Sequence, residues 1–195
     1  MAEEIKEKTH MLPCDVKRKR LIKTEANTNP SYGKKPEERR VGEILKNGII
    51  NLDKPSGPTS HQVDAWLKKI FNLDKVGHGG TLDPNATGVL PIGLQDATKA
   101  LQALLPAGKE YVGIMRFHND FKIDDLKKVS KNFVGKIDQL PPVRSAVKRR
   151  KRKREIYYLD LLEFKGRDVL FKVGCESGTY VRTLCVDIGK KMGVK

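Results

Sequence analysis

Alternating apolar and polar runs predict a strand, a helix and a second strand in the first half of the chain. Residues 49–52 are mostly apolar and lead into the turn-forming sequence KPSGP, the pattern of a short strand. In HQVDAWLKKIF (61–71) the apolar residues fall on one helical face, and Thr59 and Ser60 together offer an N-cap. The run GVLPIGL (88–94) predicts a buried strand, and DATKALQALL (96–105) predicts a short helix.

Strand patterns dominate the second half. KEYVGIMRFH (109–118) predicts a strand, and IDDLKKVSKNF (123–133) predicts a charged surface helix. REIYYLDLLEF (154–164) and DVLFKVGCES (168–177) flank the turn sequence KGR, which is typical of an antiparallel hairpin.

The remaining segments complete the predicted architecture. GTYVRTLCVDIGKKMG (178–193) predicts a helix that Thr179 caps and Gly193 ends. Residues 1–40 are polar and charged, which predicts a basic N-terminal extension ahead of a domain at 41–195. The element order predicts an α+β fold with a mixed, largely antiparallel sheet flanked by helices.

The net charge of the chain indicates which classes of molecule it binds. Of 195 residues, 39 are Lys or Arg and 24 are Asp or Glu, so the net charge is +15 and the chain should bind a polyanion. Nucleic acid and anionic membrane both fit that charge, but there is no run of about 18 apolar residues and the first residues lack a signal peptide's apolar segment. We therefore expect a soluble intracellular protein with no membrane partner.

Cysteine and histidine spacing predicts no metal. Cys14, Cys175 and Cys185 form no C-x-x-C pair, so neither a disulfide framework nor a zinc knuckle is indicated. The four histidines are not spaced three or four residues apart, as histidine pairs in helical metal sites are.

A basic segment follows LPP. RSAVKRRKRKR (144–154) has eight Lys or Arg in eleven positions, including Arg149, Arg150, Lys151 and Arg152. One interpretation is a solvated sheet edge that charge keeps from pairing, and the other is an arm that binds RNA phosphates. The same residues also fit a nuclear-localisation signal.

Asp83 lies in KVGHGGTLDPNATGVLPIG (75–93), which has five glycines and two prolines. An Asp before Pro is commonly a turn initiator. Here the glycines permit close backbone approach to a ligand and Pro84 fixes the loop's exit, which favours a rigidly presented carboxylate. Arg182 could keep such a carboxylate ionised and oriented, and Tyr111 is either a core aromatic or a platform on which an unpaired base stacks.

Four segments together resemble the TruB-type pseudouridine synthases. They are INLDKPSGPTSHQVDAWLKK, KVGHGGTLDPNATGVLPIGLQDATK, GKEYVGIMRFH and CESGTYVRTLCVDIG, in family order and at family spacing. The sequences SHQVDAW, AGKEYVGI and PPVRSAVKRR resemble the dyskerin branch, the RNA-guided synthases of H/ACA particles.

The resemblance implies the roles of individual residues. Asp83 is then the catalytic aspartate, Tyr111 stacks on the flipped base and Arg182 pairs with the carboxylate. Substrate-binding residues include His61 near the flipped nucleotide, Lys54 in the first motif, which mainly supports the loop, and the basic residues 149–152. The segment near 140–151 corresponds to a thumb that closes on RNA, within a partial catalytic domain at 41–195.

The resemblance also implies activity and partners. It implies isomerisation of uridine to pseudouridine in rRNA or tRNA without a cofactor, with an H/ACA guide RNA and the particle's small core proteins as partners. The family continues beyond Lys195 with further strands and a PUA domain, so the resemblance implies an incomplete domain lacking PUA. Two alternatives are a stand-alone tRNA synthase and a catalytically inert RNA-binding or assembly module. The compartment is the cytoplasm in an archaeon and the nucleus or nucleolus in a eukaryote.

Overall fold

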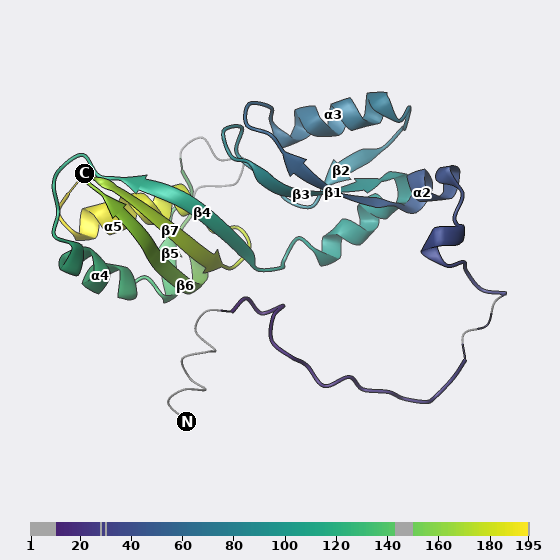
Figure 1. Cartoon of the computed structure of the whole chain (residues 1–195), viewed down its shortest axis with the longest axis horizontal. Helices are drawn as coiled ribbons and strands as arrows, with labels where there is room; N and C mark the ends of the chain where they lie inside the picture. The colour runs from purple at the N-terminus through teal and green to yellow at the C-terminus, as the bar shows by residue number, and fades with distance from the viewer. Residues whose placement is uncertain (1–10, 28, 30, 143–149, 195) are drawn as a thin grey trace. The chain divides into compact units, whose positions relative to one another are not determined.

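The computed structural model describes residues 11–27, 29, 31–142 and 150–194. The chain forms two compact units (Figure 1). The first unit comprises the described residues of Lys19–Pro106, and the second comprises those of Ala107–Lys195 together with residues 11–18. None of the helices in the described ranges is long and apolar enough to span a membrane.

The first unit is a three-stranded antiparallel sheet in the order β1-β3-β2, with α3 beside it (Figure 1). Its elements are, in chain order, η2 (Pro36–Glu38), α2 (Val41–Asn47), β1 (Ile49–Lys54), α3 (Ser60–Ile70), β2 (Val76–His78), β3 (Gly88–Leu94) and η3 (Gln95–Ala103). The predicted strands at 49–52 and 88–94 and the helix at 61–71 are confirmed. The Thr59 side chain accepts a hydrogen bond from the backbone N–H of Gln62, as predicted for an N-cap.

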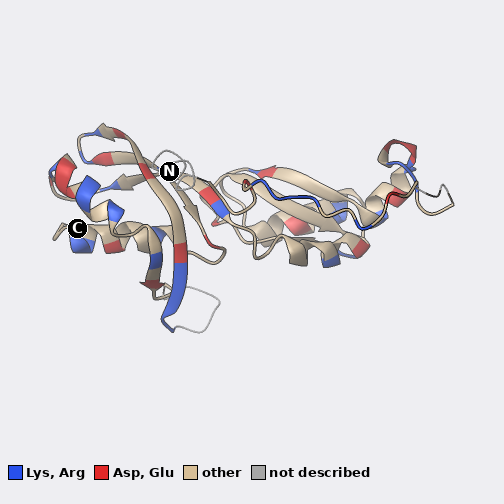
Figure 2. Cartoon of the chain, turned by 90° about the horizontal axis from the view of Figure 1, so that it is seen from below, with Lys and Arg blue, Asp and Glu red and all other residues tan. Residues whose placement is uncertain are grey.

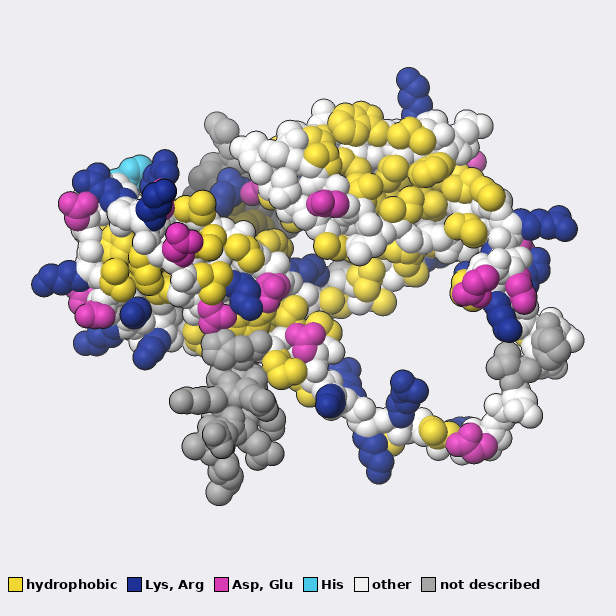
Figure 3. Space-filling view, viewed as in Figure 1, with side chains coloured by type: hydrophobic (Ala, Val, Ile, Leu, Met, Phe, Trp, Pro, Cys, Tyr) yellow, Lys and Arg dark blue, Asp and Glu magenta, His cyan; other side chains and the backbone are white. Residues whose placement is uncertain are grey.

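The core of the first unit lies between α3 and β3. Val63 is 3% exposed and packs with three alternate residues of β3 that are nearly inaccessible to solvent, Leu90, Ile92 and Leu94. The rest of the predicted apolar face of α3 is less completely covered, since Trp66 is 53% and Ile70 70% exposed. Figure 3 shows hydrophobic side chains gathered over α3 and the sheet on this face of the unit.

The opposite side of β3 carries η3 at very short range. A Cβ atom on Gly93 would lie 2.9 Å from the carbonyl oxygen of Ala97 and from the backbone N and Cα of Thr98. Only glycine permits this approach. The short helix predicted at 96–105 is present, but it is a 3₁₀-helix that begins at Gln95.

The second unit is a four-stranded antiparallel sheet in the order β4-β7-β6-β5. Its elements are β4 (Lys109–Arg116), α4 (Ile123–Lys131), β5 (Gly135–Gln139), β6 (Arg152–Lys165), β7 (Asp168–Cys175) and α5 (Val181–Lys191). Leu126 of α4 and Leu184 and Ile188 of α5 are buried in one cluster with Phe171 and Val173 of β7. The α+β fold with antiparallel sheets and flanking helices is confirmed.

The predicted hairpin is confirmed as β6 and β7, and Gly166 takes a positive φ of 59° in its turn. The final helix is also present, and Gly193, with φ of 72°, follows its C-cap. The predicted N-cap is wrong by one residue, because Tyr180 occupies that position. The Thr179 hydroxyl instead donates to the carbonyl oxygen of Glu176 at 2.7 Å.

Part of the predicted N-terminal extension belongs to the second unit. A Cβ atom on Gly108 would lie 3.2 Å from Cδ of Pro13 and 3.4 Å from a side-chain carbon of Leu12. The start of the extension's described part therefore lies against the beginning of β4, whereas residues from Lys19 onward group with the first unit.

Candidate functional site

Asp83 lies on the exposed loop that joins β2 to β3. A turn follows it, in which the backbone N–H of Ala86 donates to the carbonyl oxygen of Asp83 at 3.0 Å. Gly80 and Gly88 take φ values of 142° and 121°, a region that other residues rarely adopt. These two glycines therefore allow the loop to turn on both sides of the carboxylate.

The residue after Asp83 is fixed by a buried lysine. Lys54 is 0% exposed, and its ammonium donates hydrogen bonds to the carbonyl oxygens of Pro55 at 2.7 Å, Pro58 at 2.8 Å and Pro84 at 3.1 Å. The backbone N–H of Gly57 donates to the same Pro84 oxygen at 2.9 Å. Three carbonyls use the three donors of the ammonium, so Lys54 supports the loop, and its contact with a substrate stays a prediction.

The residue before Asp83 is fixed by a buried hydroxyl. Ser60 is 0% exposed; its Oγ accepts from the backbone N–H of Leu82 at 3.0 Å and donates to the Leu82 carbonyl oxygen at 3.2 Å. The sequence presented Ser60 only as a partner to Thr59 at the helix start. Its second role depends on a residue 22 positions away and has no local signal.

A histidine without a predicted role lies at the entrance of the loop. His78 Nδ1 is 2.6 Å from Oδ2 of Asp64, and its Nε2 is 3.2 Å from Oγ1 of Thr81. The ring of His61 meets the ring of His78 edge-on, with centroids 4.9 Å apart. One ligand atom from each of His61, Asp64 and His78 can lie within 4.8 Å of the others, so these residues could hold a metal ion.

Tyr111 and Arg182 belong to the second unit, whereas Asp83 belongs to the first. Tyr111 is a partly buried residue of β4, opposite Val173 of β7, and packs against the core. Arg182 is exposed in the first turn of α5. The pairing of Arg182 with Asp83 therefore stays a prediction.

A buried glutamine fixes the start of α5. Gln139 is 2% exposed; its Nε2 donates to the carbonyl oxygen of Tyr180 at 3.2 Å, and its Oε1 accepts from the Tyr180 N–H at 3.0 Å. Tyr180 is the N-cap of α5, two residues before Arg182. This anchor was also missed, because it joins positions 41 residues apart.

The basic segment enters the sheet partway along its length. Arg149 lies outside the described residues, and Arg150 and Lys151 are exposed just ahead of β6. Arg152 opens β6 and lies opposite Gln139 of β5. Figure 2 shows Lys and Arg at the start of β6. The segment thus combines exposed cations with a paired strand, and both interpretations of its charge stay open.

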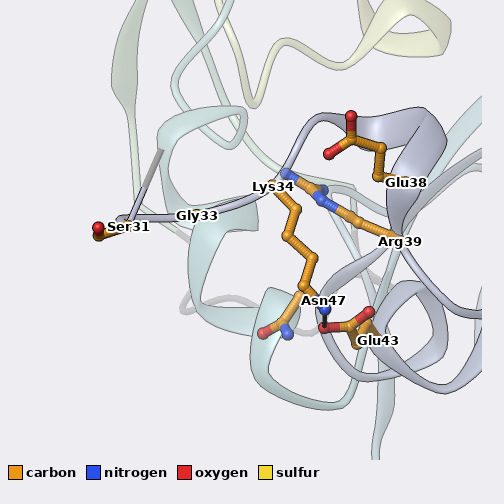
Figure 4. A pocket seen from close by; sticks show the side chains of 7 residues that line it. All are labelled: Ser31, Gly33, Lys34, Glu38, Arg39, Glu43 and Asn47. Carbon is orange, nitrogen blue, oxygen red and sulfur yellow. Dashed lines mark hydrogen bonds and ion pairs between the residues drawn. The ribbon is translucent and has the colours of Figure 1, made fainter. Parts of the chain in front are cut away.

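One surface hollow lies apart from these residues (Figure 4). Its lining residues come from the N-terminal part of the first unit: Ser31, Gly33, Lys34, Glu38, Arg39, Glu43 and Asn47. The Lys34 ammonium donates to Glu43 at 2.8 Å and lowers the pKa of that carboxyl. None of the predicted site residues lines the hollow.

Two family descriptions match the chain. Residues 68–181 match the N-terminal domain of the TruB family of pseudouridylate synthases, and residues 9–64 match the DKCLD (NUC011) domain. The chain is 58% identical over 188 residues to a probable tRNA pseudouridine synthase B of Methanopyrus kandleri, covering 96% of this chain and 56% of that protein. Its identity to the protein of the same name from Pyrococcus furiosus is also 58%, covering 94% and 54%.

Two solved structures contain chains that match this one in fold and in sequence. In the crystal structure of a Cbf5-Nop10-Gar1 complex, one chain matches with a TM-score of 0.89 and 57% identity, covering 95% of this chain and 57% of that one. A chain in the structure of an H/ACA RNP bound to a substrate RNA containing 2′-deoxyuridine matches with a TM-score of 0.86 and 53% identity, covering 95% and 56%. The chain thus spans about half the length of the curated relatives it matches.

Proposed function

Because the chain belongs to the TruB family of pseudouridylate synthases, on its dyskerin branch, we propose that it is the catalytic portion of a guide-RNA-dependent synthase that isomerises uridine to pseudouridine in rRNA. The observation that carries the proposal is the match of 95% of the chain to a protein solved with Nop10 and Gar1. By that likeness its partners are an H/ACA guide RNA, a substrate RNA and small core proteins. The archaeal relatives favour the cytoplasm as its compartment.

The reaction is an internal rearrangement of one nucleotide. The bond from N1 of uracil to C1′ of ribose breaks, the base turns, and C5 bonds to C1′; C5 then loses a proton and N1 gains one. No atom or electron enters or leaves overall, so the chemistry needs a carboxylate, a base-holding pocket and exclusion of water. We propose that Asp83 acts on the ribose, Tyr111 stacks on the flipped base and Arg182 keeps the carboxylate ionised and oriented.

The loop around Asp83 supports this role. The residues on both sides of Asp83 are tied by buried side chains, Ser60 to Leu82 and Lys54 to Pro84. A carboxylate held in this way loses little conformational freedom when the sugar arrives. Positioning a catalytic group before the reaction in this manner accounts for much of the rate acceleration by enzymes.

Adduct trapping tests the proposed function. The chain is mixed with fluorouridine-substituted target RNA, an H/ACA guide and the small core proteins, and a covalent adduct is sought by denaturing electrophoresis. We expect an adduct that depends on the guide and disappears in Asp83→Asn. Modification of tRNA at full rate without a guide would support the stand-alone alternative. An adduct that survives in Asp83→Asn would rule out this aspartate, and RNA binding without any adduct would support the inert-module alternative.

The proposed pairing of Asp83 with Arg182 is tested by a double-mutant cycle. We expect Arg182→Ala to lower turnover by orders of magnitude with little change in RNA binding, because the carboxylate loses its orienting partner. Arg182→Lys should restore only part of the rate, since an ammonium lacks the planar two-pronged contact. If Arg182→Ala and Asp83→Asn lower the rate by independent factors, the two residues do not act as a unit.

The proposed binding of RNA by the basic segment is tested by salt dependence. We expect joint replacement of Arg150, Lys151 and Arg152 by Ser to weaken RNA binding across unrelated sequences, because phosphates carry no sequence information. For each phosphate that the variant no longer neutralises, the slope of log K against log salt should fall by about 0.7 for single-stranded RNA. Replacement of three exposed lysines of α4, Lys127, Lys128 and Lys131, removes the same charge elsewhere as a control. Equal salt slopes in the two triple variants would mean that the segment affects RNA binding only through the net charge of the chain.

A further inference from the structure

His61, Asp64 and His78 form a mixed nitrogen and oxygen cluster inside the first unit. His61 and Asp64 are three residues apart on α3, and His78 ends β2. Asp64 Oδ2 is 2.6 Å from Nδ1 of His78 and 4.0 Å from Nδ1 of His61. The two imidazole rings meet at an interplanar angle of 69°. One histidine from the helix and one from the strand thus converge on a single carboxylate.

The burial of the cluster is uneven in a way that suits a bound ion. The side chains of His78 and Asp64 are 8% and 13% exposed, whereas that of His61 is 84% exposed. Asp64 Oδ1 is buried and has no hydrogen-bond partner in the described structure. A buried carboxylate oxygen without a partner is costly, and a cation bound to the same carboxylate would lower that cost, because its charge acts on both oxygens.

We propose that His61, Asp64 and His78 bind a divalent transition-metal cation, for which Zn²⁺ is the natural probe. Imidazole nitrogens and a carboxylate oxygen suit zinc, and the paired imidazoles disfavour magnesium and calcium. Bonds of about 2.0–2.2 Å place the ligand atoms of a tetrahedral zinc site roughly 3.3–3.6 Å apart. His78 and Asp64 need to separate slightly, and the exposed His61 has room to close the longer gap.

Binding moves one proton within His78. In the metal-free protein the 2.6 Å contact is a hydrogen bond between Nδ1 of His78 and Oδ2 of Asp64. Zinc takes the place of the proton between these atoms, and that proton passes to Nε2 of the neutral ring, which then donates it to Oγ1 of Thr81. A water molecule completes the fourth position, as in zinc sites with three protein ligands. The ion would then join α3 to β2 at the entrance of the Asp83 loop.

This site departs from the sequence-based expectation of no metal. That expectation considered only the spacing of cysteines and of histidines, and it missed a helix His–Asp pair that a distant histidine approaches. The proposal goes beyond the proposed function and does not rest on it, because binding can be measured without RNA or turnover.

The test is zinc binding by the whole chain. Protein treated with a chelator is titrated with zinc chloride by calorimetry near pH 7.5, and Co²⁺ absorption reports the ligand geometry. We expect one ion per chain, a tetrahedral cobalt spectrum and a rise in Tm with zinc. His61→Ala and Asp64→Asn should each weaken binding at least about tenfold and reduce the Tm shift.

Two controls keep the result interpretable. His61 is largely exposed, so His61→Ala should not impair folding even if His78→Ala does. His118→Ala removes an exposed histidine of the second unit and should leave binding unchanged, and a Cys14→Ser background removes an exposed thiol that could take up zinc. The proposal is overturned if zinc does not bind, if His61→Ala and Asp64→Asn bind like the parent chain, or if His118→Ala weakens binding equally.

Discussion

Lys54→Met should destabilise the first unit although it replaces a buried charge by an apolar side chain of similar length. The ammonium is 0% exposed and donates to three backbone carbonyls between 2.7 and 3.1 Å away. Methionine fills much the same space but leaves these carbonyl oxygens without that donor. Removing one partner of a buried polar contact strands the other, which is the most costly kind of substitution.

The size of the effect follows from two opposing terms. Hydrogen bonds to a charged group contribute about 1.5–3 kcal/mol each, so three of them give a gross loss of roughly 4.5–9 kcal/mol. Against this, methionine removes the cost of keeping an ammonium out of water, which is several kcal/mol. We expect a net loss of about 3 kcal/mol in the free energy of unfolding, because methionine has no donor for any of the three carbonyls.

Urea unfolding followed by circular dichroism measures this change. With a slope of about 2 kcal/mol per molar urea, the midpoint should fall by roughly 1.5 M. Lys69→Met is the matched control, since Lys69 is exposed in the last turn of α3. A midpoint for Lys54→Met that equals that of Lys69→Met would refute the reasoning and imply that the charge's desolvation cost cancels its hydrogen bonds.

Two further predictions concern glycine packing and thiol reactivity. Gly93→Ala should lower the free energy of unfolding by about 2 kcal/mol, because its Cβ would meet backbone atoms at 2.9 Å. Gly42→Ala is the control: Gly42 lies in α2 with open space around it, so this variant should be neutral or stabilised by up to about 1 kcal/mol. Equal urea midpoints for the two variants would contradict this prediction. Burial raises the pKa of Cys175 and of Cys185 to about 11, so near pH 8 about one thiol in a thousand is the reactive thiolate. Iodoacetamide should therefore label the exposed Cys14 first by mass spectrometry, with the buried thiols gaining reactivity only as pH rises toward 11, and equal labelling at pH 8 would contradict the burial.

Long or strongly apolar segments were predictable, because the spacing of apolar residues within each segment indicates which face is buried. The hairpin β6–β7 and the helix α3 follow this rule. Four short elements, η2, α2, β2 and β5, were not predicted. β2 has only three residues, and its partner is β3, so pairing across the sheet and not its own composition makes it a strand.

The candidate site divides in the same way. The glycines and prolines around Asp83 predicted a shaped loop, because backbone permissiveness is a local property. The support of the loop by Lys54 was expected only from the family resemblance, and the anchors Ser60 and Gln139 were not predicted. Each of the three acts on a backbone group 22 or more residues away in the chain. A buried polar residue looks like a surface residue in sequence until its distant partner is known.

These anchors share a physical logic that bears on the proposed catalysis. Polar side chains that are at most 2% exposed fix the backbone next to Asp83 and at the start of the helix that carries Arg182. Removing an apolar side chain from water would cost no desolvation energy at each position, whereas a buried polar group is tolerated only when it is hydrogen-bonded. The hydrogen bonds of the anchors therefore contribute position: they specify where a backbone segment lies, whereas apolar packing tolerates small shifts. If the proposed roles hold, loss of an anchor should lower turnover more than RNA affinity, because phosphate binding depends far less on the exact position of one carboxylate.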